Sequence, residues 1–437
     1  MASQIWNDIF NKNMNNIPKN IHNNYELKLD SVYGINNRID YTNLIIYSID
    51  PENCTDADDA FSVYKENNLI HLFIHIADPT AYFNPIDPLF DDIIKNGTTV
   101  YLSNNEPDHL FPKNILEECS LINGIKNVLI VHTIINNLNI ISSKVEYGII
   151  NCSNGKRFSY ESSVLNLDDV LLLSLEVSEY LKSKRNCSAI NDLSLVIPIV
   201  KDSEVILKPD IKEVKMMKNM IAEFAIHANT IFAQELDINN LFLRKLELHD
   251  KDYDNIHDLI ENKICASYTN KNIKHDLIGT NSCYTHSTSP LRRTSDCIVH
   301  FLLKSKFLLL ESPFTHEQLE TFADILNKKN KEMKQLQFKD SKLRTFQWIA
   351  EELESRLNPI KIKVKLMKSK GFFINLMIIK IDNMDVNISY TLKMNNKRKN
   401  KLKELNEINS IIINITKINP FINYDEGTLP ELDAIFE

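Results

Sequence analysis

The spacing of apolar residues changes twice along this chain of 437 residues, and these changes most constrain its fold. Between Leu44 and Ile150, β-branched and aromatic residues form short runs bounded by Asn, Asp, Pro or Gly, which is typical of strands. These runs are 44–49, 69–77, 127–135 and 145–150. Over 213–236 the apolar residues recur every three or four positions, which predicts a helix with one buried face. A sheet followed by helices indicates an α+β fold.

Two capping signals predict further helices in the second half of the chain. Ser289 and Pro290 pair an N-cap residue with a proline tolerated in the first turn, so the apolar text that follows predicts a buried helix over 290–310. Thr315 and Gln318 form a capping box, which predicts a helix that extends, with interruptions, to about Leu357.

Strand-like runs return beyond Pro359, separated by turns rich in Lys and Asn. This pattern predicts a small β-barrel at the C-terminus. We therefore divide the chain into an irregular lead-in over 1–40, a large α+β domain over 41–357 and a small β domain over 358–437.

Composition narrows the classes of protein to which the chain can belong. The net charge of −8 disfavours nucleic acid only on average, because basic residues gather in the late segments 327–344, 361–370 and 395–403. No run reaches the roughly 20 apolar residues that span a bilayer, and no secretion signal opens the chain, so we expect a soluble, unsecreted protein that does not bind membranes. Seven cysteines without a close pair favour free thiols in a reducing compartment.

Four aspartates, Asp50, Asp56, Asp58 and Asp59, lie close together after the first strand-like run. Carboxylates this close repel one another unless they share cations. In an extended stretch Asp58 and Asp59 point in opposite directions, so all four converge only on a bent loop. Such a loop can hold one or two Mg²⁺ ions, and two ions about 4 Å apart suit the displacement of a phosphodiester. A solvated turn and a structural calcium site are alternatives that spacing alone leaves open.

The stretch SIDPENCTDADDAF (48–61) resembles the signature of the RNB family of exoribonucleases, which includes ribonuclease II, ribonuclease R and the catalytic subunit of the exosome. Further segments resemble family motifs in the family's order: HIADPTAYF (75–83), GTTVYL (97–102), LFPKNILEECSL (110–121), MIAEFAIHAN (220–229) and YTHSTSPLRRTSDCIVH (284–300). The resemblance implies an RNB-type catalytic domain over 41–357, a sheet with helices packed around a channel for RNA, followed by an OB-like RNA-binding barrel.

The resemblance also implies a catalytic centre. The metal-site aspartates of the family fall on Asp50, Asp56, Asp58 and Asp59, which implies Mg²⁺ or Mn²⁺ as cofactor, and Asp58 is the position expected to be least replaceable. The catalytic arginine of the family falls on Arg292. A guanidinium folded against the carboxylates would offset charge on the scissile phosphate.

Four more residues match family positions that contact RNA. Tyr101 is implied to stack on a base at the 3′ end, and Tyr160 matches a second tyrosine of the channel. Glu223 is implied to reach a terminal ribose, which would favour RNA over DNA, and Arg293 is implied to hold a neighbouring phosphate. We interpret the histidines inside the motifs, His75, His286 and His300, as hydrogen-bonded packing residues.

These features imply a metal-dependent exoribonuclease that degrades single-stranded RNA from the 3′ end to nucleoside 5′-monophosphates, in the cytoplasm, or in the host cytoplasm if the gene is viral. Residues 1–40 are too few for the cold-shock barrels of the family, so a protein partner is expected in their place. Gln335 and Gln337 stand where the family has a glutamate, and Asp192 stands near an expected aromatic residue. The alternatives are an RNB-fold RNA-binding protein without useful catalysis and a nuclease for DNA or short oligonucleotides.

Overall fold

The computed structural model describes residues 6, 8, 10, 14, 19–103, 107–137, 139–185, 195–202, 204–248, 259, 264–280, 282–356, 358–370, 373–393, 411–419 and 431–436. Within these residues the fold is α+β, as the sequence predicts. None of the helices in this part of the chain combines the length and the apolar character needed to cross a membrane.

The larger body is built on a seven-stranded sheet with the order β1-β6-β5-β4-β3-β2-β7. Its strands are β1 (Ile39–Asp40), β2 (Tyr47–Asp50), β3 (Asp59–Glu66), β4 (Leu69–Ala77), β5 (Ile125–Asn136), β6 (Asn139–Asn151) and β7 (Lys156–Ser159). The middle strand β4 is buried from Leu72 to Ala77, which explains its nearly continuous apolar run. β2, β4, β5 and β6 were predicted, whereas β3, which begins within the aspartate cluster, was not.

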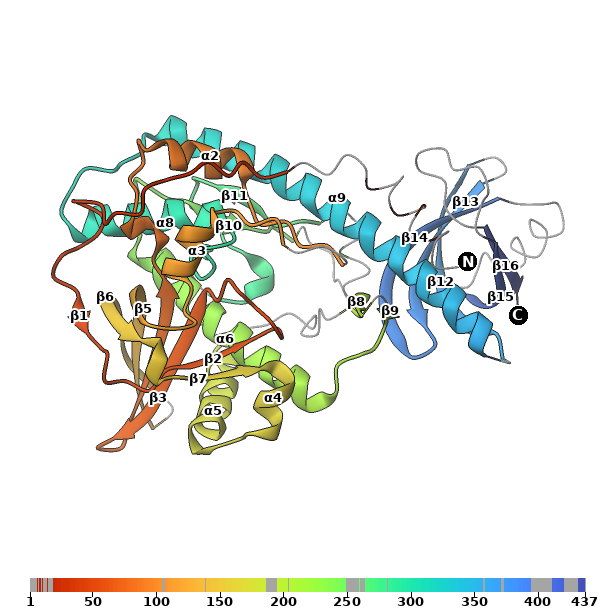
Figure 1. The fold of residues 1–437 in the computed structure, drawn as a ribbon, viewed down its shortest axis with the longest axis horizontal. Helices are drawn as coiled ribbons and strands as arrows, with labels where there is room; N and C mark the ends of the chain where they lie inside the picture. Colours follow the sequence, from red (N-terminus) through yellow and green to blue (C-terminus); the bar gives the residue numbers. More distant parts are fainter. Residues whose placement is uncertain are drawn as a thin grey trace.

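Helices cover this sheet and bring distant segments to its edge (Figure 1). α6 (Lys212–Glu235) agrees with the helix predicted over 213–236, and Met217, Met220, Phe224, Ala228 and Phe232 form its buried stripe. α5 (Asp169–Ser183) and α4 (Tyr160–Leu165) pack beside α6. The remaining elements of this body are α2 (Pro88–Asn96), α3 (Lys113–Cys119), α8 (Thr294–Phe307) and the short hairpin of β10 (Leu243–Lys245) with β11 (Ser267–Thr269).

The helix predicted over 290–310 begins later than expected, at Thr294, and ends at Phe307. The reason is a set of contacts from outside the segment. The backbone N–H of Thr99 donates to the carbonyl of Arg292 at 3.0 Å, and Arg293 pairs with Thr98 in an antiparallel bridge. These bonds hold Arg293 in extended conformation (φ −138°, ψ 123°), so Arg292 lies in a turn before the helix rather than in its first turn.

α9 (His316–Ser355) is one continuous helix of 40 residues, about 60 Å long, without the predicted interruptions. It begins with the predicted capping box of Thr315 and Gln318. Figure 1 shows it running from α2 and α8 to the C-terminal strands. Its second half contributes Leu343, Phe346 and Ile349 to a second buried apolar cluster, separate from the core under the large sheet.

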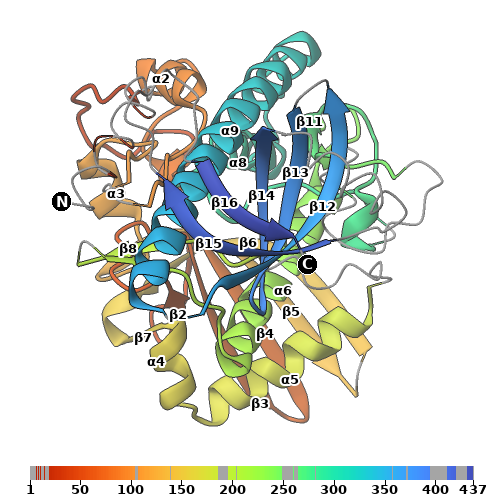
Figure 2. The ribbon, with the colours of Figure 1, turned by 90° about the vertical axis from the view of Figure 1, so that its right-hand side faces the viewer.

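This second cluster lies against a five-stranded antiparallel sheet (Figure 2). The sheet has the order β14-β13-β12-β15-β16. Its strands are β12 (Ile360–Lys370), β13 (Phe373–Ile381), β14 (Met384–Lys393), β15 (Ile411–Asn419) and β16 (Glu431–Phe436). The described pairings do not join β14 to β16, so a closed OB-like barrel is not shown. Trp6, Phe10 and Met14, and the short hairpin of β8 (Ile199–Lys201) with β9 (Glu204–Ile206), contribute to or pack against the same cluster.

Candidate active site

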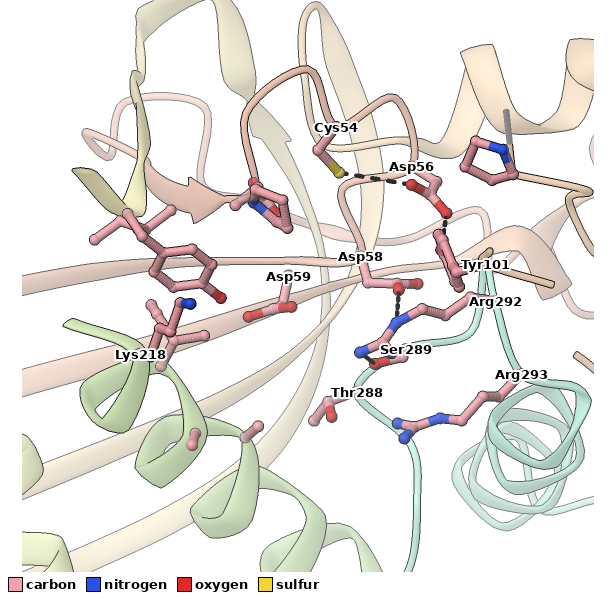
Figure 3. Close-up of a pocket in the computed structure, with 18 of the residues that line it drawn as sticks. Cys54, Asp56, Asp58, Asp59, Tyr101, Lys218, Thr288, Ser289, Arg292 and Arg293 are labelled. Atoms are coloured by element: carbon pink, nitrogen blue, oxygen red, sulfur yellow. Dashed lines mark hydrogen bonds and ion pairs between the residues drawn. The ribbon is translucent and has the colours of Figure 1, made fainter. Parts of the chain in front are cut away.

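A cavity of about 1000 Å³ lies where β2 ends and β3 begins. The parts of the chain that line it include the β2–β3 loop, the segment around Tyr101 and His109, the start of α4, one face of α6, and the turn that precedes α8. Figure 3 shows Asp58 of the loop facing Arg292 of the turn. The fold thus brings the aspartate cluster and the late arginine to a single cavity.

The β2–β3 loop is held in its bent shape by backbone contacts with neighbouring segments. The N–H of Ala57 donates to Ser120 Oγ at 2.9 Å, and the carbonyl of Ala57 accepts from Leu121 at 2.9 Å. The N–H of Ala77 donates to the carbonyl of Asp58 at 2.8 Å. These bonds bury Asp56 and Asp58, whose exposed fractions are 7% and 4%.

Asp58 and Arg292, 234 residues apart, are joined directly. Arg292 Nε donates to Asp58 Oδ2 at 2.9 Å, and the backbone N–H of Leu291 donates to Asp58 Oδ1 at 2.7 Å. Arg292 Nη2 also donates to Ser289 Oγ at 2.7 Å. Burial nevertheless raises the pKa of Asp58 well above its usual value, and Arg292 opposes that shift. The Arg292 side chain stays 44% exposed, so its guanidinium is accessible from the cavity.

Asp56 is held from two sides. The hydroxyl of Tyr101 donates to Asp56 Oδ2, and His109 Nδ1 lies 3.5 Å from the same oxygen. The thiol of Cys54 contacts Asp56 Oδ1 at 3.6 Å. Burial alone would raise the pKa of Asp56, but His109 and Tyr101 bring the pKa below its usual value. Asp56 is therefore the carboxylate of the cluster that remains charged most easily.

Asp50 and Asp59 lie in less favourable surroundings. Burial and the negative charge of Asp59 raise the pKa of Asp50 to about 7, and burial raises the pKa of Asp59 to about 6. The Oδ2 atom of Asp50 is buried without a hydrogen-bond partner. Figure 3 shows the Asp58 carboxylate turned toward Arg292 and that of Asp59 turned away from it, as expected for adjacent residues at a strand end.

The donor set of this cavity fits a hard divalent cation. A desolvated carboxylate oxygen without a partner, beside further carboxylates with raised pKa values, gains most from a bound positive charge. Mg²⁺ and Mn²⁺ prefer such oxygen ligands. In the described residues, as they are placed, no three His, Cys, Asp or Glu side chains are close enough together to hold an ion. The residue types therefore fit the cofactor, while a ligand geometry is not shown.

Tyr160 lies in the cavity because β2 and β7 run parallel. Their register pairs Asp50 with Ser159, so the next residue, Tyr160, begins α4 beside the end of β2. Lys218 of α6 lies 5.5 Å from the centre of the Tyr160 ring and also binds Asp210 at 2.6 Å. The predicted channel tyrosine thus lines the same cavity as the aspartates.

Arg293 lines the cavity, but its guanidinium is already paired. Its Nε and Nη2 atoms donate to the two oxygens of Asp296 at 3.0 and 2.9 Å. Asp296 is thus the partner of Arg293, whereas Arg292 pairs with Asp58. Of the two arginines, Arg292 is the one whose ion pair is with the aspartate cluster.

Glu223 does not lie in this cavity. It is 7% exposed on another face of α6, where Arg185 Nε donates to it at 2.9 Å and a second bond completes a bidentate ion pair. Glu223 and His227 line a separate cavity of about 330 Å³, whereas Ala225 and Asn229 line the first. Positions 223 and 225 differ by about 200° around a helix, so they face different sides of α6, while Ile226 lines both cavities. The predicted Asp192 lies outside the described residues.

The lining residues that were not predicted include His109, Lys218 and Ser289. No motif spacing in the sequence marks any of these three as a site residue. For two of them, the position in the sequence was the nearest hint of a role in the site. Ser289 precedes Arg292 inside a motif, and His109 precedes the LFP segment. Their roles arise from contacts with residues remote in sequence.

Comparison with known proteins bears directly on this site. The RNB domain model matches residues 38–264 and 242–308. Ribonuclease R of Thermotoga maritima is 28% identical over 352 residues, covering 67% of this chain and 49% of the relative. The exosome complex exonuclease dis3 of Schizosaccharomyces pombe is 28% identical over 236 residues, covering 50% of this chain and 24% of the relative. The chain spans less than half the length of these two relatives.

Solved structures show the same fold. Mycoplasma genitalium RNase R in complex with ribose methylated single-stranded RNA superposes with a TM-score of 0.69 at 18% identity, covering 95% of this chain and 76% of that one. Yeast Ssd1, described as a pseudonuclease, superposes with a TM-score of 0.62 at 15% identity, covering 90% and 54%. With an RNB domain match over most of residues 38–308, the aspartate cluster and Arg292 at one cavity, and an RNase R fold, this chain belongs to the RNB domain family.

Proposed function

We propose that this chain is a metal-dependent exoribonuclease that hydrolyses single-stranded RNA from the 3′ end and releases nucleoside 5′-monophosphates. The observation that carries the proposal is the contact between Asp58 and Arg292 at a cavity that Asp50, Asp56 and Asp59 also line. A buried carboxylate cluster with a partly exposed guanidinium suits metal-assisted phosphodiester hydrolysis.

Asp50, Asp56, Asp58 and Asp59 would hold one or two Mg²⁺ or Mn²⁺ ions. When bound, such ions activate water and stabilise the charge that develops on the phosphate oxygens. The unpartnered Oδ2 of Asp50 supports this assignment, because its burial has no compensation within the protein.

The side chains around the aspartates would position the RNA end. Arg292, fixed by Asp58 and Ser289, would offset charge on the scissile phosphate. The Tyr101 ring, part of a residue that is 37% exposed, offers a surface on which a base of any identity can stack. Tyr160 would contact the RNA from the opposite wall. Arg293, already paired with Asp296, would contribute positive potential near a neighbouring phosphate.

The experiment that tests the proposal uses single-stranded RNA labelled at the 5′ end, with Mg²⁺ or Mn²⁺. We expect progressive shortening from the 3′ end and mononucleotides that carry a 5′-phosphate. Asp58→Asn should abolish the reaction while the protein remains folded. Internal cleavage, or products with a 3′-phosphate, would contradict the proposal. The same RNA with 2′-deoxyribose separates a nuclease of altered substrate from one that prefers RNA.

An RNB-fold RNA-binding protein without catalysis is the second candidate, because the pseudonuclease Ssd1 shares the fold. The presence of all four aspartates and Arg292 at one cavity favours the enzyme. A stable complex with RNA that is not degraded under any divalent cation would favour the binder.

The domain boundaries, the cellular compartment and a protein partner are also proposals. We propose a catalytic domain over 41–357 and an OB-like RNA-binding domain over 358–437, preceded by the lead-in over 1–40. We also propose that the protein acts in the cytoplasm, or in the host cytoplasm if the gene is viral. We further propose a protein partner in place of the cold-shock domains, which would be detected as a protein that binds this chain and increases its affinity for long RNA.

A further inference from the structure

One face of α9 forms hydrogen bonds with the short segment that carries Tyr101. Asp340 Oδ2 accepts from the backbone N–H of Ser103 at 2.8 Å, and Asp340 Oδ1 accepts from Ser103 Oγ at 2.7 Å. Arg344 Nε donates to Ser103 Oγ at 3.2 Å, and Gln337 Nε2 lies 3.5 Å from the carbonyl of Tyr101. Residues 337, 340 and 344 are three and four positions apart, so they lie on one face of the helix.

The burial and the hydrogen bonds of Asp340 indicate a specific contact. Asp340 is 5% exposed, although it lies on a helix of largely polar sequence, and its two oxygens satisfy two donors of one residue. Buried carboxylates are costly unless hydrogen bonds compensate them. The segment that receives these bonds lies two residues beyond Tyr101, whose hydroxyl reaches Asp56 in the cavity.

We propose that Asp340 is a positioning residue that fixes Tyr101, through Ser103, for contact with the RNA end. The inference rests on the proposed function, because it concerns how the stacking tyrosine is held. It adds a role for α9, which also contributes to the second apolar cluster beneath the C-terminal strands. Asp340 itself touches neither RNA nor the reacting atoms. It keeps the Tyr101 backbone in the place from which the ring faces the cavity and the hydroxyl reaches Asp56.

The test reads the position of Tyr101 without catalysis. RNA with 2-aminopurine as its 3′-terminal base is mixed with saturating protein in EDTA, and quenching of its fluorescence reports stacking. We expect quenching by the wild type and loss of most of it in Tyr101→Ala. Asp340→Asn should lose at least half of the quenching, because each Ser103 donor bonds a different oxygen of Asp340 and asparagine has an NH₂ group in place of one of them. In Mg²⁺, Asp340→Asn should also raise KM roughly tenfold, which corresponds to one hydrogen bond to a charged group.

Asp324→Asn is the matched control, because Asp324 is an exposed aspartate on the same helix, and it should quench as the wild type does. Ser103→Ala removes the bond from Ser103 Oγ to Asp340 and should lose a smaller part of the quenching. This variant tests the proposal if Asp340→Asn does not fold. Wild-type quenching in Asp340→Asn, or in Ser103→Ala when Asp340→Asn is unfolded, would overturn the proposal. So would quenching that does not depend on Tyr101. A wild type that stacks the RNA end but never hydrolyses it would refute the proposed function and leave this inference standing.

Discussion

Replacing Arg292 by lysine keeps a positive charge at the cavity but removes the geometry that directs it. The guanidinium donates through Nε to Asp58 Oδ2 at 2.9 Å and through Nη2 to Ser289 Oγ at 2.7 Å. A lysine has one terminal nitrogen at the end of a flexible chain, so it cannot reproduce both bonds and also face the substrate. Arg292→Lys is therefore a test of geometry at constant charge.

The size of the effect follows from these contacts. A hydrogen bond to a charged group contributes about 1.5–3 kcal/mol, and loss of one donor aimed at developing charge lowers kcat by about 10²–10³-fold. We expect Arg292→Lys to lower kcat about 10²-fold or more. KM should change little, because the RNA contacts proposed for Tyr101 and Tyr160 are kept. The thermal unfolding midpoint should change little too, since the lysine can still pair with Asp58.

Single-turnover hydrolysis of 5′-labelled RNA, with protein in excess, isolates this step from product release. Arg356→Lys makes the same exchange at an exposed, ion-paired arginine that does not line the cavity, and it should keep the wild-type rate. A rate for Arg292→Lys within about threefold of the wild type, under conditions in which Asp58→Asn is inactive, would refute the reasoning. Arg292 would then be only the structural partner of Asp58.

Three further changes test other parts of the structure. Because the pKa of Asp50 is raised to about 7, the folded state holds this proton more tightly than the unfolded chain, and metal-free protein should lose stability as pH rises from about 4 to about 7. Asp50→Asn should reduce that loss. Denaturant unfolding in EDTA should show a higher unfolding free energy for the variant than for the wild type above pH 7, and equal values near pH 4. If the two unfolding free energies change with pH in parallel, this assignment is wrong. Lys304→Met removes a fully buried ammonium that binds Asp78 at 2.7 Å. Asp78 keeps its buried ion pair with Arg38 at 2.6 Å, so the loss should lie at the lower end of the range for a broken buried pair, about 3 kcal/mol of unfolding free energy. The exposed control Lys306→Met should cost about 0–1 kcal/mol. Tyr101→Ala should weaken RNA binding by about 1–3 kcal/mol whichever base ends the RNA, whereas Tyr101→Phe should retain most of the affinity; a strong dependence on the terminal base would exclude simple stacking.

Several local elements could be predicted from the sequence because their determinants are local. β4 was predicted at its observed bounds from a run of buried residues, and α6 from its stripe of Met and Phe. Thr315 and Gln318 predicted the start of α9 because both halves of a capping box lie within one turn. In these three cases the signal lies within a few residues, and the observed element agreed with the pattern.

The predictions that differed from the structure depended on contacts with remote segments. Pro290 marks a helix start by local rules, yet bonds from Thr98 and Thr99 hold the following residues outside α8. β3 was missed because its first residue belongs to the aspartate cluster, which by itself indicates a loop. Glu223 matched a motif, but the rotation of α6 places it in another cavity, paired with Arg185.

The sequence by itself determined which residue types are available: four carboxylates on a bent loop, an arginine in a late motif, and an aromatic residue between them. The tertiary structure alone decided that Arg292 meets Asp58, that Asp296 pairs with Arg293, and that His109 and Tyr101 share Asp56. The physical reason is the difference in range between local signals and tertiary contacts. Propensity and capping act over about one helical turn, whereas a contact across 234 residues exists only after the sheet and α8 have packed together and brought its two ends into reach.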